Sequence, residues 1–380
     1  MAMNLLITAM SSAKGPSGIC RHACNLARCA ASRKEVAQIT LVVGKWQESY
    51  FHASFKLKDE KLNIFPVDIA NDAFARNLWY LQELPRLADK ISADIVHLSF
   101  PVPIRKTSLR RPVVVSLHDL YPYDEPDNFG FPNVFFNRVF LQKCLAEVDY
   151  VACVSEATLS RLKGRCPRIA QRKAIVIYNC VAISSDESTT PVGEKHHFVL
   201  VVAQHRANKN IPLALMAFEK LLQGEKLDSR ALLLLVGNEG PETAAIMSLI
   251  KKRGLENNVK LVNTVSDGEL RWLYTNCKLL LAPSMMEGFG LPVVEGLLYG
   301  SRVVCSDIPA FREMGGETCH YFDIHSKSQS NAVVLAICDA LAAPTRTAQR
   351  LDRFSLENIA GEYAALYSQL KEDSLKALPR

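Results

Sequence analysis

Two glutamates bracket a glycine-rich segment in the second half of the chain, "EGFGLPVVEGLLYG", which begins at Glu287. Gly288 and Gly290 let backbone N–H groups approach a ligand closely, because neither residue carries a side chain. Pro292 is typical of the first turn of a helix, and a helix N-terminus attracts phosphate through its N–H groups and dipole. Carboxylates accept hydrogen bonds from hydroxyls, so Glu287 and Glu295 are expected to hold sugar hydroxyls on either side of a phosphate site. Either acid alone would fit an ordinary surface glutamate; the complete pattern indicates a site.

A lysine follows an earlier apolar run, in the segment "VVAQHRANKNIPLALMAF" that begins at Val201. Lys209 lies three residues before Pro212 and therefore at a predicted helix start. An ammonium group there adds a point charge to the N–H groups that bind phosphate. The alternative is a solvated loop lysine, and we expect the phosphate contact.

A histidine directly follows the buried run "VVVSL" in the first half of the chain. His118 at such a strand end can contact a reacting group, although an isolated histidine more often satisfies backbone groups. Asp119 is expected to orient or cap its neighbours. His97, which ends the run "DIVHL", is a further candidate for lining an acceptor.

The first loop of the chain contains Gly15 and Gly18 in "SSAKGPSGICRHACNLA". This G-x-x-G spacing is a weak signal for a ligand-binding turn. The fuller G-x-G-x-x-G fingerprint is missing here, so the loop does not support a dinucleotide-dependent redox enzyme.

Cysteines cluster with a histidine just after this loop, at Cys20, Cys24, Cys29 and His22. Their spacing fits one apolar face of a helix better than a metal site. We therefore expect no metal.

Short apolar runs alternate with amphipathic windows along most of the chain. Continuous apolar runs indicate strands buried on both faces, which is typical of parallel sheets covered by helices. The fold class is therefore α/β, with two doubly wound domains whose ligand loops lie at the carboxyl ends of the strands. Helices are expected near Cys20–Ala31, Asn77–Lys90, Phe135–Glu147, Pro212–Leu222, Glu242–Arg253, Asp267–Tyr274, Pro292–Tyr299, Gln329–Leu341 and Ser355–Leu370.

The length of 380 residues suits two domains. The polar segment Ala182–Lys195 lacks periodicity and predicts a linker. We expect domains at residues 1–181 and 196–350, the linker at 182–195, and a C-terminal helical segment at 351–380 that packs back on the first domain.

Composition restricts the class of protein further. The eleven cysteines show no regular framework and several lie in apolar runs, which favours a reducing, cytoplasmic compartment over a disulfide scaffold. No stretch has the length of a membrane span, and the N-terminus lacks the basic region of a signal peptide. The net charge of +6 is compatible with several partners and selects none of them.

The segment "EGFGLPVVEGLLYG" closely resembles the E-x7-E motif of the retaining glycosyltransferases of family four. Segments such as "SDIPAFREMGG", "VSDGELRWLYTNCKLLLAPS" and "VVVSLHDLYPYD" extend the resemblance over nearly the whole chain, which is similar to a mannosyltransferase-like group. The resemblance implies a GT-B fold of two Rossmann-like domains that face each other across a cleft. The first would be the acceptor side and the second would bind the nucleotide-sugar donor.

The resemblance also implies roles for individual residues. Glu287 would contact donor-sugar hydroxyls, Glu295 the ribose, and backbone at Gly288, Phe289, Gly290 and Leu291 the sugar and diphosphate. Lys209 matches the family's diphosphate-binding lysine, and His118 its histidine near the sugar. Gly15 and Gly18 match the family's glycine loop.

Three positions depart from the family pattern. Gln204 occupies the place of an expected arginine, and Arg206 either replaces that arginine or faces solvent. Tyr178 and Cys180 stand where the family usually has proline and glycine.

The expected function is transfer of a hexose from a nucleotide diphosphate sugar, with GDP-mannose slightly favoured, to a saccharide or lipid-linked saccharide hydroxyl. The role would lie in cell-surface polysaccharide or lipopolysaccharide assembly. His118, Glu287 and Lys209 are the expected catalytic group. The nucleotide sugar is a co-substrate, and no metal or other cofactor is expected. The alternatives are a nucleotide-sugar binding or scaffold protein without transferase activity, or a GT-B epimerase or hydrolase.

Basic residues cluster at Ile104–Arg111 and Arg161–Lys173. They predict either a solvated face or peripheral contact with an anionic membrane at its inner face. The clusters lack interleaved aromatic residues, so nucleic acid is not an expected partner.

Overall fold

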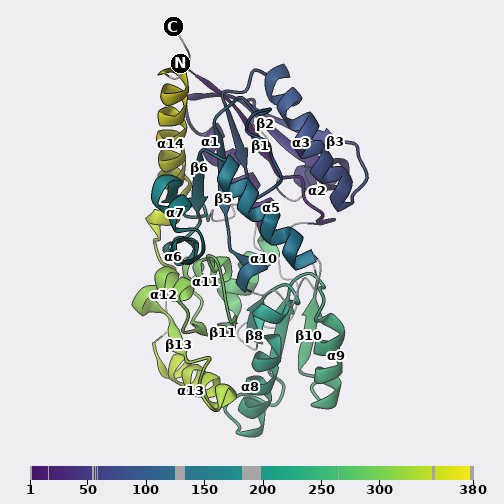
Figure 1. Cartoon of the computed structure of the whole chain (residues 1–380). Coiled ribbons are helices and arrows are strands. Elements are labelled where there is room, and N and C mark those ends of the chain that lie inside the picture. Colours follow the sequence, from purple (N-terminus) through teal and green to yellow (C-terminus); the bar gives the residue numbers. More distant parts are fainter. Residues whose placement is uncertain are drawn as a thin grey trace. The chain divides into compact units, whose positions relative to one another are not determined.

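The computed structural model describes residues 2–15, 17–53, 55, 57, 59–124, 133–181, 198–263, 265–344 and 347–376 (Figure 1). The chain divides into two compact units: unit 1 is Met1–Ala182 with Asp352–Arg380, and unit 2 is Ile183–Leu351. The predicted linker at 182–195 lies outside the described residues. Each unit is an α/β domain, which confirms the predicted fold class.

Unit 1 contains a parallel sheet with the strand order β3-β2-β1-β4-β5-β6-β7. The central strands are buried on both faces, as their continuous apolar runs predict. β3 was not predicted because it lies at the edge, is partly exposed and contains Pro66. The strands are β1 (Met3–Thr8), β2 (Val36–Gly44), β3 (Leu62–Val67), β4 (Ile95–Leu98), β5 (Val113–Leu117), β6 (Tyr150–Cys153) and β7 (Ala174–Val176).

Helices cover both faces of this sheet. One core packs the sheet against α1, α2 and α14, and the other packs it against α3, α5, α6 and α7. Side chains of Ser17, Asp72 and Ser155 cap α1, α3 and α6 and satisfy N–H groups of their first turns. The helices are α1 (Gly18–Ala31), α2 (Lys45–Ala53), α3 (Ala73–Lys90), α4 (Tyr121–Asp124), α5 (Asn133–Glu147), α6 (Glu156–Arg165), α7 (Pro167–Lys173) and α14 (Leu356–Lys376).

The C-terminal helix α14 belongs to unit 1, where it lies beside α1 (Figure 1). The backbone N–H of Val181 donates to the carbonyl of Phe354, so the last described residue before unit 2 bonds to the segment that returns from it. The ring of Tyr178 packs edge-on against that of Phe354, and the amide of Asn25 donates to the carbonyl of Cys180. Tyr178, one of the departures from the family pattern, therefore has a packing role at this junction, while Cys180 bonds through its backbone and has a buried side chain.

Unit 2 contains a second parallel sheet, with the order β10-β9-β8-β11-β12-β13. Ser266 and Glu269 form a capping box at the start of α10. The strands are β8 (Phe198–Val202), β9 (Leu232–Val236), β10 (Val259–Val262), β11 (Leu279–Ala282), β12 (Val303–Ser306) and β13 (His320–Phe322). The helices are α8 (Ile211–Gln223), α9 (Thr243–Lys252), α10 (Asp267–Asn276), α11 (Leu291–Leu298), α12 (Pro309–Gly315) and α13 (Gln329–Ala342), with 3-10 turns at Ala207–Lys209, Gly316–Thr318 and, in unit 1, Asp352–Phe354.

Each sheet has a point where the strand order reverses direction. In unit 1 it lies between β1 and β4, and in unit 2 between β8 and β11. Ligands of doubly wound proteins bind outside the carboxyl ends of the strands at such points. In unit 2 the loops concerned are those that carry Lys209 and Glu287, so the topology places both predicted residues at the expected edge.

Candidate active site

The start of α11 is shaped by Gly290. This residue has φ +97° and ψ 48°, in the left-handed region that favours glycine. A Cβ atom built on it would lie 2.8 Å from ring carbons of Phe311, so the position also excludes a side chain by space. No side chain caps α11, and Pro292 occupies its first turn. The structure therefore places a helix start with a left-handed glycine and no side-chain cap where the sequence predicts one, and its phosphate-binding role stays a prediction.

Lys209 and Glu287 form an ion pair in unit 2, with 2.6 Å between Nζ and Oε1. The hydroxyl of Ser284 donates to the same carboxylate oxygen over 2.7 Å. The side chains of the lysine and the glutamate are only 21% and 12% exposed. An ammonium has three donors and a carboxylate about four acceptor positions, so each group can take part in more than one hydrogen bond. The sequence predicted each residue separately but not their contact.

Backbone contacts join the two loops that carry this ion pair. The N–H of Met285 donates to the carbonyl of Asn208 over 2.8 Å, and the side-chain amide of Asn208 donates to the carbonyl of Met286 over 3.4 Å. Asn210, with φ 50°, takes the left-handed conformation that ends the turn before α8. Ion pair and backbone together hold the loops after β8 and β11 as one assembly.

Glu295 is oriented by a tyrosine from the preceding helix. The hydroxyl of Tyr274, in α10, donates to Oε2 of Glu295 over 2.7 Å. Tyr274 is fully buried and its ring stacks on that of Tyr299. At Gly296 a Cβ would lie 2.7 Å from Leu280, so the absence of a side chain lets α11 lie close to β11. Glu295 thus projects from a tightly packed helix with one carboxylate oxygen already bonded.

The loop after β8 separates the two candidate diphosphate residues. Gln204 is half-buried and Arg206 is exposed. Between them His205 is fully buried, and its Nδ1 lies 2.9 Å from the hydroxyl of Thr243. The backbone of Gly240 passes so close that a Cβ there would lie 2.4 Å from the carbonyl oxygen of His205. The sequence analysis missed both His205 and the glycine.

The loop that carries Gly15 follows β1 in unit 1 and leads into α1 at Gly18. Gln47 of α2 is fully buried beneath it and makes five hydrogen bonds of 2.9–3.3 Å to the β1 end of the loop and to neighbouring strand and helix atoms. One of these is accepted by the hydroxyl of Tyr50. This side chain, which no sequence pattern indicated, fixes the start of the loop.

His118 follows β5, and its Nε2 lies 2.8 Å from the carbonyl oxygen of Ser99. A carbonyl only accepts, so Nε2 carries the proton and Nδ1 of the neutral ring is an acceptor. Burial lowers the pKa of His118, which keeps the ring neutral at physiological pH. Its chemistry is therefore that of a hydrogen-bond acceptor at Nδ1.

Asp119 and His97, the two other candidates near His118, have different outcomes. Asp119 accepts a hydrogen bond from the N–H of Tyr121, consistent with the predicted local cap. His97 is fully buried and hydrogen-bonded to Ser116 and Tyr367, so the suggestion that it lines an acceptor surface is wrong.

Cys20, Cys24 and Cys29 lie in the core of unit 1 against α14 and the sheet. Within the described part of the chain, no group of three or more His, Cys, Asp or Glu side chains is arranged to hold a metal ion.

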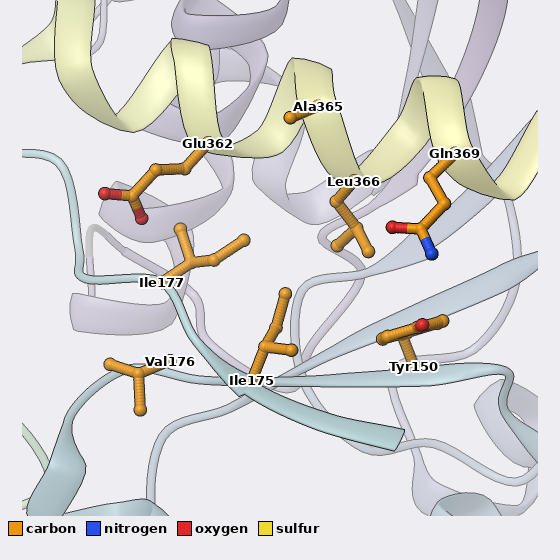
Figure 2. Close-up of a pocket in the computed structure, with 8 residues that line it drawn as sticks. All are labelled: Tyr150, Ile175, Val176, Ile177, Glu362, Ala365, Leu366 and Gln369. Atoms are coloured by element: carbon orange, nitrogen blue, oxygen red, sulfur yellow. The ribbon is translucent and has the colours of Figure 1, made fainter. Parts of the chain in front are cut away.

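A pocket of about 450 Å³ lies between α14 and the edge of the sheet in unit 1 (Figure 2). Leu366 of α14 faces Ile175 across it, and Glu362 and Gln369 contribute polar groups. None of its lining residues belongs to the predicted site.

Comparisons with known proteins agree with this geometry. Residues 16–185 match the family described as "Glycosyltransferase Family 4", and residues 184–355 match "Glycosyl transferases group 1". The O-antigen chain mannosyltransferase RfbU of Salmonella typhimurium is 26% identical over 68% of this chain and 70% of its own length. The O-antigen chain mannosyltransferase B of Escherichia coli is 26% identical over 54% of this chain, which spans about half (55%) of that relative.

The fold is likewise that of known enzymes. Anabaena HepE, solved with UDP and glucose, superposes with a TM-score of 0.66 at 18% identity over 97% of this chain and all of its own. Two doubly wound units, with an acid-flanked helix N-terminus and a lysine at the switch point of the second, define a GT-B glycosyltransferase. The chain belongs to glycosyltransferase family four.

Several functional candidates escaped the sequence analysis: Tyr274, Ser284, His205 and Gln47. Tyr274, His205 and Gln47 bond to partners distant in the sequence, whereas Ser284 bonds to Glu287, three residues away. For Tyr274 and Ser284 the sequence offered one indication of a role, namely that both lie in a segment that resembles the family.

Proposed function

We propose that this protein is a retaining hexosyltransferase that takes its sugar from a nucleoside diphosphate sugar, with GDP-mannose favoured. The acceptor is a hydroxyl of a saccharide or lipid-linked saccharide, in the assembly of a cell-surface polysaccharide or lipopolysaccharide. The observation that carries the proposal is the Lys209–Glu287 ion pair beside the uncapped start of α11. The mannosyltransferases at 26% identity support the choice of sugar.

The residue roles follow from the chemistry of the groups. N–H groups at the start of α11 and the ammonium of Lys209 stabilise the charge that develops on the leaving diphosphate. Glu287, positioned by the lysine and Ser284, accepts from sugar hydroxyls, and Glu295 accepts from the ribose. His118 accepts a hydroxyl hydrogen bond at Nδ1. Gly15, Gly18, Gln204 and Arg206 contribute donor contacts from loops at the carboxyl ends of their strands.

In the reaction the anomeric C–O bond to the diphosphate breaks, and a C–O bond to the acceptor oxygen forms on the same face of the sugar. The acceptor proton passes to the departing phosphate oxygen, so no side chain acts as general base. The protein contributes positioning and electrostatic stabilisation. No metal is required in this scheme, and activity should persist in excess EDTA.

The first test is calorimetric titration with GDP, UDP, ADP and dTDP in EDTA, for the wild type and for Glu295→Ala. Selective GDP binding that weakens in the variant supports the donor site. Turnover is then measured with GDP-mannose and p-nitrophenyl α-D-mannopyranoside. An α-linked product supports retention, nucleotide release without acceptor indicates a hydrolase, and nucleotide binding without turnover over an acceptor panel favours the scaffold alternative.

Peripheral contact with an anionic membrane is the second part of the proposal. Phe135, Phe136 and Phe140 of α5 are 58%, 50% and 37% exposed, and Phe74 of α3, a helix that packs on the same face of the sheet, is 78% exposed. Exposed aromatic side chains on one face are typical of a surface that enters a bilayer interface. Among the described helices, none is long and apolar enough to cross a membrane.

The predicted basic clusters offer less free positive charge to a membrane than their number of Lys and Arg residues implies. Lys106, Arg111 and Arg161 pair with Asp149, Asp89 and Asp124. The aromatic face therefore makes the sharper prediction. Sedimentation with phosphatidylglycerol vesicles, but not with phosphatidylcholine vesicles, is expected for the wild type, with a marked loss in a Phe135→Ser, Phe136→Ser variant. Equal sedimentation of the wild type and the double variant would contradict this contact.

A further inference from the structure

Next to His118, unit 1 buries a row of hydrogen-bonded side chains to which the proposed reaction assigns no role. Nε2 of His22 lies 2.9 Å from the hydroxyl of Ser116, and Nε2 of His97 lies 2.8 Å from the same oxygen. Nδ1 of His97 lies 2.5 Å from the hydroxyl of Tyr367. These four side chains are at most 5% exposed. The row therefore joins α1, β5, β4 and α14 inside the unit.

The protons of this row are constrained. Ser116 has one hydroxyl proton, so it donates to at most one of the two imidazoles and accepts from at least one. Burial lowers the pKa of His22 well below its ordinary value and that of His97 to about 3, so both rings are neutral near pH 7. Neither ring supplies a positive charge at the reacting centre.

His22 also contacts His118 directly. The ring centroids are 4.5 Å apart and the ring planes are nearly perpendicular, at 87°. His22 itself is 5% exposed, while His118 is half-buried. Any influence of His22 on a ligand therefore passes through His118.

We propose that His22 is a positioning residue for His118: its ring packs against the His118 ring and fixes the direction in which Nδ1 accepts a hydrogen bond. The second torsion angle of a histidine side chain has broad preferences, so the hydrogen bond from Nε2 to Ser99 alone leaves the ring plane poorly determined. Small misplacements of a contact group reduce turnover strongly. The inference rests on the proposed function, in which His118 contacts the sugar.

Two variants separate the ring from its hydrogen bond. His22→Phe keeps an aromatic ring against His118 and loses the bond to Ser116. His22→Gln keeps a group that reaches Ser116 and loses the ring. With GDP-mannose and p-nitrophenyl α-D-mannopyranoside, we expect kcat within about twofold of wild type for the Phe variant and at least about tenfold lower for the Gln variant. GDP affinity is expected to be unchanged in both.

The reverse order of kcat, or a parallel loss of GDP affinity, would overturn the positioning role. A second readout needs no turnover: NMR relaxation of the ring C–H groups of His118, assigned with His118→Gln. The ring should be ordered in the wild type and in His22→Phe and more mobile in His22→Gln, while its tautomer, set by the carbonyl of Ser99, stays the same. An equally ordered His118 ring in His22→Gln refutes the inference. Absent turnover in the wild type would instead count against the proposed function.

Discussion

The hydroxyl of Tyr274 provides the sharpest single-atom test of the donor site. Tyr274→Phe removes the donor that holds Oε2 of Glu295 and keeps the ring that stacks on Tyr299. Because the ring is fully buried and keeps its packing, the substitution changes only the hydroxyl group. What is lost is the orientation of Glu295 before the ribose arrives.

The magnitude follows from the cost of ordering a side chain. Immobilising one flexible side chain on binding costs about 0.5–1.5 kcal/mol, which corresponds to an affinity loss of about 2- to 12-fold. Glu295→Ala removes the hydroxyl contacts themselves. Hydrogen bonds to a charged group contribute about 1.5–3 kcal/mol, so the loss there is about 10- to 150-fold. Tyr274→Phe should therefore lie between the wild type and Glu295→Ala.

The assay is calorimetric titration with GDP and with 2′,3′-dideoxy-GDP, which lacks the hydroxyls that Glu295 is proposed to bind. The loss of affinity caused by Tyr274→Phe should be seen with GDP and should be absent with the dideoxy nucleotide. Tyr321→Phe is a matched control, because its hydroxyl donates to carbonyls of Phe311 and Gly316 elsewhere in unit 2. An equal loss with both nucleotides, or no loss with GDP where Glu295→Ala has one, would refute the reasoning.

Three further predictions concern the ion pair, the left-handed glycine and the buried histidines. Lys209→Met should lower the affinity for GDP about 10- to 150-fold and leave the affinity for guanosine unchanged in calorimetric titrations, since the ammonium is proposed to bind phosphate. Equal losses of affinity for the two ligands would argue against that role. Gly290→Ala should destabilise unit 2 by about 1–3 kcal/mol in thermal unfolding, because an alanine is strained at φ +97° and its Cβ meets a ring; unchanged stability would contradict that strain. His97 has a folded-state pKa of about 3 against about 6.5 unfolded, so its stabilisation is complete above pH 6.5 and decreases by about 1.4 kcal/mol per unit as the pH falls toward 3. Hydrogen exchange of the β4 amides measures the free energy of unfolding between pH 5 and 7. Its dependence on pH should be weaker in His97→Gln than in the wild type, by the equivalent of about one proton. The same dependence in both proteins would mean that His97 is protonated in the folded state.

Local sequence patterns predicted the α/β fold class and most of the strands. Apolar runs such as those of β1 and β5 indicated buried parallel strands, and the helix starts at α8 and α11 were marked by prolines near Lys209 and Gly290. The edge strand β3 and the helix α2 were missed because partial exposure weakens their periodicity. The short elements β13, α4, α6, α7 and α12 were also missed, since three to ten residues give little periodicity.

The sequence by itself determined the residue types and the loops in which they lie, because periodicity, glycine and proline act over a few residues. Only the tertiary structure decided which side chains meet. Lys209 and Glu287 are 78 residues apart, His22 and Ser116 are 94 apart, and the contact of Tyr367 with β4 spans 270. Such contacts depend on strand order and register, and a short-range pattern carries no information about either. The same limit explains why the buried row beside His118 became visible only in the folded chain.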